Sequence, residues 1–274
     1  MIRTVHPQPL LRPFIRSFRF RESVVTESLR FPIPARPVQF MEFYLRDRYQ
    51  VIDFASEVVT TAPSVVVLGQ QTRRLSDLHL QGNYAVFTIN FQPTGFHRLF
   101  GVSMSELSDT AIPADAILGD SVNALQEQLA HAGSLVERVE LTERFLLPKV
   151  MKATSFPPIV WAADSILCGH GRVSLDALRR ESGLGLRQFE RQFDRYVGVT
   201  PKRFARIARF QRAVTLGRLY GEGNWTRIAA EAGYFDQMHL IKDFRELSGQ
   251  TPTLLHQAVR ATESWNPLRA LDKE

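Results

Sequence analysis

Short runs of apolar and aromatic residues, each closed by polar or turn-forming residues, characterise the first third of the chain. Four such runs, rich in β-branched and aromatic residues, are Val38–Leu45, Tyr49–Phe54, Val65–Leu68 and Tyr84–Phe91. Strands without a helical pattern between them are typical of sandwiches and barrels rather than of parallel α/β sheets. We therefore expect a β-rich N-terminal domain shaped like a barrel or a sandwich.

After Gly95 the apolar positions change to helical spacing. A short helix is expected over Phe96–Phe100, and two longer helices over Val122–His131 and Leu135–Lys149. The apolar stripe of the two longer helices would fit the β-rich domain or a second subunit, and packing on their own domain is the simpler expectation. Successive prolines within Thr154–Pro158 forbid a continuing helix, so we place a boundary there. This division predicts one domain over residues 1–153 and a second over residues 157–260.

The second domain contains an internal repeat. Five positions recur 51 residues later with the same or a similar residue: Phe189, Phe193, Gly198, Thr200 and Pro201 become Leu240, Phe244, Gly249, Thr251 and Pro252. Each copy predicts two short helices around a glycine turn, over 175–181 and 186–197 in the first and over 225–232 and 237–248 in the second. Ser174, Asn224 and Asp236 are expected to cap these helices. Helix, glycine turn and helix in this order is the pattern that places a second helix in a DNA major groove.

The segment Gly233–Pro252 resembles the second helix-turn-helix signature of the AraC/XylS family of transcription regulators, and Leu175–Pro201 resembles the more variable first unit of that family. The resemblance implies an α+β protein of two domains, with two helix-turn-helix units at about 174–198 and 225–249. It also implies that a long helix, Pro201–Tyr220, joins the units and holds their recognition helices in successive major grooves about 34 Å apart.

The distribution of charge agrees with a polyanionic partner for the second domain. Residues 1–150 carry 15 basic and 15 acidic side chains, whereas residues 151–274 carry 19 and 13, which accounts for the whole net charge of +6. Arginine dominates the basic residues of this half, and its guanidinium suits bidentate binding of phosphate and guanine. A solvated basic surface without a ligand would show the same balance.

The faces of the two expected recognition helices opposite their apolar residues supply candidate DNA contacts. Base-reading candidates are Arg187, Glu190 and Arg191 in the first helix and Gln237, Met238, Ile241 and Lys242 in the second. Candidates for contacts to the DNA backbone are Arg195, Thr200, Lys202, Arg203, Arg206 and Thr251. Because its face carries more charge, we expect the first unit to contribute more base specificity.

The N-terminal domain is similar to sensor domains found ahead of this DNA-binding domain, which implies an effector, dimerisation, or both. Alternate strand positions face one side of a sheet, so one set of side chains could line an effector pocket or form an ordinary core: Phe40, Glu42, Tyr44, Phe87 and Phe91. The partners implied are double-stranded DNA, a small-molecule effector, a second copy of the chain and, for an activator, RNA polymerase.

Other function classes find little support in the sequence. We find no zinc-binding cluster, nucleophile elbow or nucleotide-binding glycine loop, so we expect no enzyme, metal or cofactor. An enzyme or DNA-repair fusion, or an architectural protein without DNA specificity, remain the alternatives. The single cysteine, Cys168, excludes an internal disulfide, and we expect it to be buried in a helix. The absence of a long apolar run or a signal sequence favours a cytoplasmic protein without a membrane span.

Overall fold

A computed structural model describes residues 1–151, 153 and 157–261 of the 274-residue chain, and the expected boundary at 154–156 lies outside these residues. The N-terminal part is one eight-stranded sheet in which every pairing is antiparallel. Its strands are β1 (Ile2–Val5), β2 (Ile15–Pro32), β3 (Phe40–Tyr44), β4 (Gln50–Asp53), β5 (Val59–Thr61), β6 (Val65–Leu68), β7 (Ser76–Phe91) and β8 (Ala111–Pro113).

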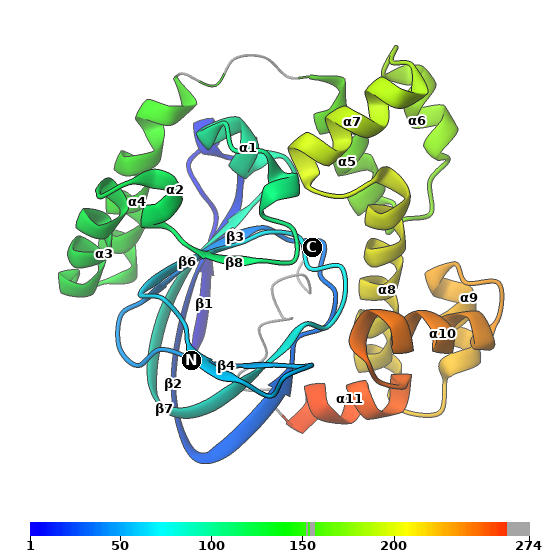
Figure 1. The fold of residues 1–274 in the computed structure, drawn as a ribbon, viewed down its shortest axis with the longest axis horizontal. Coiled ribbons are helices and arrows are strands. Elements are labelled where there is room, and N and C mark those ends of the chain that lie inside the picture. Colours follow the sequence, from blue (N-terminus) through cyan, green and yellow to red (C-terminus); the bar gives the residue numbers. More distant parts are fainter. Residues whose placement is uncertain (152, 154–156, 262–274) are drawn as a thin grey trace.

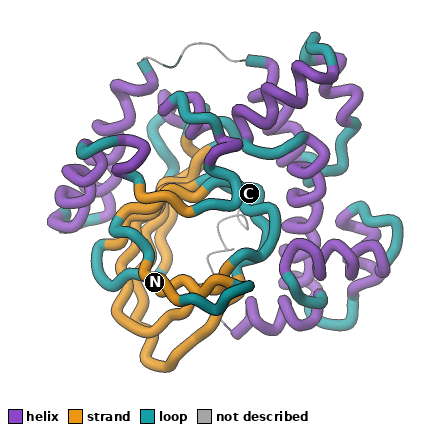
Figure 2. The backbone as a smooth tube through the Cα atoms, in the orientation of Figure 1, coloured by secondary structure: helices purple, strands orange, loops and turns teal. Residues whose placement is uncertain are grey.

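The sheet curls strongly but does not close into a barrel. Its order is β1-β2-β7-β3-β6-β8, and β4 pairs with β5 and with the first part of β7. The long strands β2 and β7 form a ribbon that bends, and Figure 2 shows how strongly the sheet is curled. The expected α+β class and β-rich domain are confirmed, whereas the barrel is corrected to an open sheet, because β1 and β8 do not pair in the described part of the chain.

The outer face of the sheet is apolar and is covered by helices. On the outer face, Phe18, Phe43 and Phe87 pack with the helices that follow the sheet in one apolar core. These helices are α1 (Gly95–Phe100), α2 (Asp115–Leu118), α3 (Ser121–His131) and α4 (Leu135–Val150), with two 3₁₀ turns, η1 (Pro9–Leu11) and η2 (Met104–Glu106). The apolar stripes of α3 and α4 are buried in this core, so the expected packing in cis is confirmed (Figure 1).

The C-terminal part is all-helical, as expected. It consists of α5 (Pro158–Cys168), α6 (Leu175–Glu181), α7 (Leu186–Val197), α8 (Pro201–Tyr220), α9 (Trp225–Ala232), α10 (Gln237–Ser248) and α11 (Pro252–Ala261). The linker helix α8 has the expected bounds because the Thr200 side chain accepts from the Arg203 amide at its start and Gly221, with φ of 75°, ends it. Ser174 and Asp236 cap α6 and α10 as expected. Asn224 does not cap α9, since its side chain donates to the Tyr220 carbonyl instead.

Cys168 is exposed, contrary to expectation. Ile159, Ala162, Ala163 and Ile166 form the buried i, i+3, i+4, i+7 stripe of α5, beside which Val160 is also buried, and Cys168 falls outside this series. Among the helices of the described residues, none is long and apolar enough to cross a membrane.

Candidate nucleic-acid interface

Helix α7 presents an uninterrupted polar face to solvent. Phe189 and Phe193 point into the core of the first helix-turn-helix unit, which leaves Arg187, Glu190 and Arg191 exposed on the opposite side. These three positions lie at i, i+3 and i+4, so they form one cluster. Within the described residues none of the three takes part in a hydrogen bond or an ion pair between side chains, so their donors and acceptors are free to meet base edges.

Helix α10 presents a less polar and less open face. Met238, with 70% of its surface exposed, and Lys242 face solvent, as the sequence predicts. Ile241 is half-buried and packs against the core, and Gln237 accepts a hydrogen bond from the Thr226 hydroxyl at 2.8 Å. The exposed base-reading candidates of the second unit are therefore Met238 and Lys242, while Gln237 and Ile241 are partly engaged within their own unit.

Both recognition helices pack against α8, with α7 beside its first turns and α10 across its middle (Figure 1). Twenty residues at 1.5 Å per residue give α8 a length of about 30 Å. Successive major grooves on one side of B-DNA are about 34 Å apart, which is comparable with the length of this linker helix.

The candidate contacts to the DNA backbone divide into three groups. Lys202 and Arg195 are exposed, and Arg195 lies near the buried His97, whose pKa is lowered by burial first and by this positive charge as well. The Thr200 and Thr251 hydroxyls cap α8 and α11 by accepting the amides of Arg203 and Leu254. Arg203 and Arg206 are bound inside the protein, which the sequence did not predict.

Arg206 joins the linker helix to the second recognition helix. Its guanidinium donates to the Asp243 carboxylate at 2.7 and 2.9 Å and also pairs with Glu246. Asp243 is buried with a side chain 3% exposed, whereas Glu246 is 46% exposed. The expected role of Arg206 as a phosphate anchor is therefore corrected, because these carboxylates bind its guanidinium and it orients α10 on α8.

Phe235 is a candidate that sequence reasoning missed. It lies in the turn before α10, next to the helix cap Asp236, and 93% of its surface is exposed. An aromatic side chain this exposed has no role in the core, and its place beside a recognition helix suits apolar contact with bases. The sequence could have indicated Phe235 as a candidate, because it lies between Tyr234 and Asp236 in the turn of the segment that resembles the family signature.

The N-terminal domain holds the C-terminal ends of both recognition helices. Residues 33–39, which connect β2 to β3 and which we call the strap, contact both units. The Ala35 amide donates to the Leu247 carbonyl at the end of α10 at 2.8 Å, and Gln39 Nε2 donates to the Val197 carbonyl at the end of α7 at 3.2 Å. The Ser108 hydroxyl also donates to the Gly198 carbonyl at 2.5 Å.

Further contacts join the N-terminal domain to the two helix-turn-helix units. Arg203 on α8 donates to the Thr72 carbonyl at 2.8 Å, and the rings of His97 and Tyr196 have centroids 4.1 Å apart. One apolar core contains residues of the sheet and of the second helix-turn-helix unit together, among them Tyr44, Val86 and Phe244. The sheet and both DNA-binding units thus form one packed body in which each constrains the others.

The expected effector-pocket residues do not line one pocket. Phe40, Glu42 and Tyr44 lie on the inner face of the sheet, whereas Phe87 and Phe91 lie in the outer core. The pairing register decides this, because Phe43 stands opposite Phe87 and Glu42 stands opposite Thr88. The phenylalanines of β7 are therefore core residues, and the inner face is lined instead by Ser17, Arg19, Arg21, Thr88 and Asn90.

Two family models match separate parts of the chain. Residues 178–258 match a family model described as "Helix-turn-helix domain", and residues 3–113 match one described as "Domain of unknown function (DUF6597)". No curated protein matches the chain in sequence.

Three solved structures resemble the chain at low identity. ToxT from Vibrio cholerae O395 is 14% identical over 89% of this chain and 98% of its own, with a TM-score of 0.45. An apo ToxT variant from Vibrio cholerae strain SCE256 is 11% identical over 93% of this chain and 99% of its own, with a TM-score of 0.47. The AraC-like transcriptional activator CuxR is 15% identical over 81% of this chain and 88% of its own, with a TM-score of 0.24.

The classification rests on the C-terminal domain. Its repeated helix-turn-helix units, the linker helix between them and the family match over 178–258 agree with the signature at Gly233–Pro252. Residues 178–258 therefore form a helix-turn-helix domain, and the repeat within them resembles that of AraC-type DNA-binding transcription regulators.

Proposed function

We propose that this regulator reads a specific DNA sequence with α7 and α10 in two successive major grooves, and that its N-terminal domain controls this reading. The observation that carries the first part is the pair of exposed recognition faces held on one linker helix about 30 Å long. Arg187, Glu190 and Arg191 supply most of the base-specific contacts, and Lys202 anchors a phosphate.

Control by the N-terminal domain is supported by the strap. A change in its position would move the ends of α7 and α10 together, because Gln39 and Ala35 bind one helix each. A small-molecule effector on the inner face of the sheet, or pairing of two copies, would act on DNA binding through this connection. A ligand can control DNA binding in this way only if it binds more tightly to one arrangement of the recognition helices than to the other.

Two substitutions separate base reading from backbone anchoring. Arg191→Ala is expected to weaken binding to the preferred sequence by about 1–3 kcal/mol and to relax specificity at one base position, because it removes a guanidinium that can bind guanine. Lys202→Ala is expected to weaken binding to all sequences alike and to reduce the salt slope by about one. Titration of selected and scrambled duplexes at several salt concentrations measures both effects, and equal behaviour of the two variants would contradict this assignment of roles.

Phe235→Ala is expected to weaken DNA binding without changing stability. Burial of a phenylalanine against DNA contributes about 1.5–3 kcal/mol, so the Kd should rise about 10- to 150-fold. The melting temperature should stay constant, because the side chain is 93% exposed in the free protein. Val136→Ala, which trims a valine 67% exposed on α4, is the matched control and should leave DNA binding intact. An unchanged Kd for Phe235→Ala would place this ring outside the interface.

A further inference from the structure

The inner face of the sheet carries an unusual number of buried charges. Pairing between strands places Arg19, Thr88 and Glu42 in one row across β2, β7 and β3, and Arg21, Val86 and Tyr44 in the next row. Side chains opposite one another in such rows point to the same face. Arg36 of the strap is buried close to them and lies over the Phe40 ring, 4.9 Å from its centroid.

Of the three buried arginines on this face, only Arg21 pairs with a carboxylate in the described part of the chain. Glu42 accepts hydrogen bonds from Arg21, from the Tyr44 hydroxyl at 3.2 Å and from the Thr88 hydroxyl at 3.3 Å. Its capacity as an acceptor is therefore used mainly by Arg21 and by two neutral groups. Arg19 and Arg36 are left without a direct carboxylate partner among these residues.

The surroundings of Arg19 and Arg36 are unfavourable for a positive charge. Arg36 is 5% exposed and donates to the neutral Gln71 amide oxygen at 2.6 Å. Arg19 is also 5% exposed, and its Nε atom has no hydrogen-bond partner among the described residues. Burial lowers the pKa of each guanidinium to about 10, although both stay charged at neutral pH. Buried charges normally have an ionic partner, and among the described residues neither Arg19 nor Arg36 has one.

We propose that Arg19 and Arg36 bind the oxyanion of a small-molecule effector, a carboxylate or a phosphate. This inference rests on the proposed control by the N-terminal domain and names the chemical class of its ligand. A guanidinium binds such groups through paired, charge-assisted hydrogen bonds, which are strong where water is excluded. Because Arg36 belongs to the strap, an anion bound there contacts the segment that holds both recognition helices.

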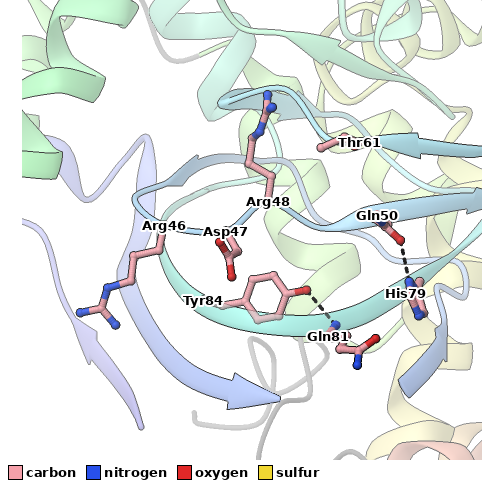
Figure 3. Close-up of a pocket in the computed structure, with 8 residues that line it drawn as sticks. All are labelled: Arg46, Asp47, Arg48, Gln50, Thr61, His79, Gln81 and Tyr84. Carbon is pink, nitrogen blue, oxygen red and sulfur yellow. Dashed lines mark hydrogen bonds between the residues drawn. The ribbon is translucent and has the colours of Figure 1, made fainter. Parts of the chain in front are cut away.

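A polar pocket marks one end of the same face. It has a volume of about 430 Å³ and lies beside the turn from β3 to β4. Figure 3 shows Arg48 and Tyr84 among the residues that line it. Tyr84 contacts Tyr49 edge-on with centroids 5.1 Å apart, and Tyr49 contacts Tyr44 at 4.7 Å. Since Tyr44 donates to Glu42, a row of tyrosines leads from this pocket to the buried arginines. The volume falls within the usual range for small-molecule sites.

The test is thermal unfolding of the full-length protein with inorganic phosphate, acetate, hexanoate or chloride at matched ionic strength. A probe in hundredfold excess over its Kd should raise the melting temperature by about 5–10 °C relative to chloride. Arg19→Gln should abolish this rise, whereas Arg144→Gln, which removes an exposed arginine of α4, should keep it. A response to phosphate alone identifies a phosphate site, and a response to hexanoate above acetate identifies a carboxylate with an apolar tail.

A second control excludes binding of the anion to the DNA-contacting surface. Lys202→Ala should retain the full stabilisation by the probe, since Lys202 lies on α8 and outside the sheet. No rise with any oxyanion, or an equal rise in Arg19→Gln and the wild type, would overturn the anion site. DNA titrations without added oxyanion report on the proposed function separately, so intact DNA binding beside an absent anion response would reject this inference alone.

Discussion

Replacing Asp243 by alanine is expected to destabilise the second helix-turn-helix unit strongly. Asp243 is almost fully buried and holds Arg206 of α8 at 2.7 and 2.9 Å. Removing one partner of a buried ion pair costs about 3–5 kcal/mol, and because Glu246 still binds Arg206 here, we expect a loss of about 2–4 kcal/mol. The free energy of unfolding from urea titration measures this loss. DNA binding should also fall, because α10 loses its orientation on the linker helix.

Glu246→Ala is the matched control, because it removes the exposed partner of the same guanidinium. Exposed ion pairs contribute about 0–1 kcal/mol, so this variant should unfold almost as the wild type does. If Asp243→Ala were no more destabilising than Glu246→Ala, the buried pair would not be what holds α10 in place.

Gly198→Ala is expected to disrupt the contact between the first recognition helix and the N-terminal domain. Gly198 has φ of 98°, and a Cβ there would lie 2.4 Å from the Ser108 hydroxyl oxygen and 2.7 Å from the Met104 carbonyl oxygen. The left-handed conformation costs a residue other than glycine about 1–2 kcal/mol. Overpacking against backbone adds about 1–3 kcal/mol, so the total loss of stability should be about 2–5 kcal/mol.

Gly183→Ala separates the two causes. Gly183 also has a positive φ, of 69°, but a Cβ there would meet nothing within 4 Å. This control should lose about 1–2 kcal/mol from backbone strain alone. Chemical denaturation of the two variants side by side gives the contribution of the interface as the difference. Equal losses would mean that the close approach of Gly198 to Met104 and Ser108 is not rigid.

The helices of the DNA-binding domain could be predicted almost to the residue because local signals set their ends. Thr200 and Pro201 begin α8, and Gly221 ends it, without help from distant parts of the chain. The same holds for α10, which Asp236 caps and Gly249 ends. The exposed polar residues of α7 could also be predicted, because helical periodicity places them opposite the buried Phe189 and Phe193.

The sheet was harder to predict because its inner face is polar. Strand β2 alternates Phe18 and Phe20 with Arg19 and Arg21, so this part of the strand contains no apolar run by which it could be predicted. The effector-pocket set mixed two faces, since a shift of one residue in strand pairing moves a side chain to the opposite face. The internal role of Arg206 depends on Asp243, which lies 37 residues away in the chain. No local pattern distinguishes such an arginine from a phosphate anchor.

The most direct test is selection of bound duplexes from a random DNA library by the full-length protein at about physiological salt. Point variants suit this experiment better than truncation at the domain boundary, because the sheet and the second helix-turn-helix unit share one apolar core. We predict a motif of two base-specific blocks whose centres are about 10–10.5 bp apart, with Arg191→Ala altering one block and Met238→Ala the other. A single block, or no enrichment of any sequence, would contradict reading of two grooves by this protein.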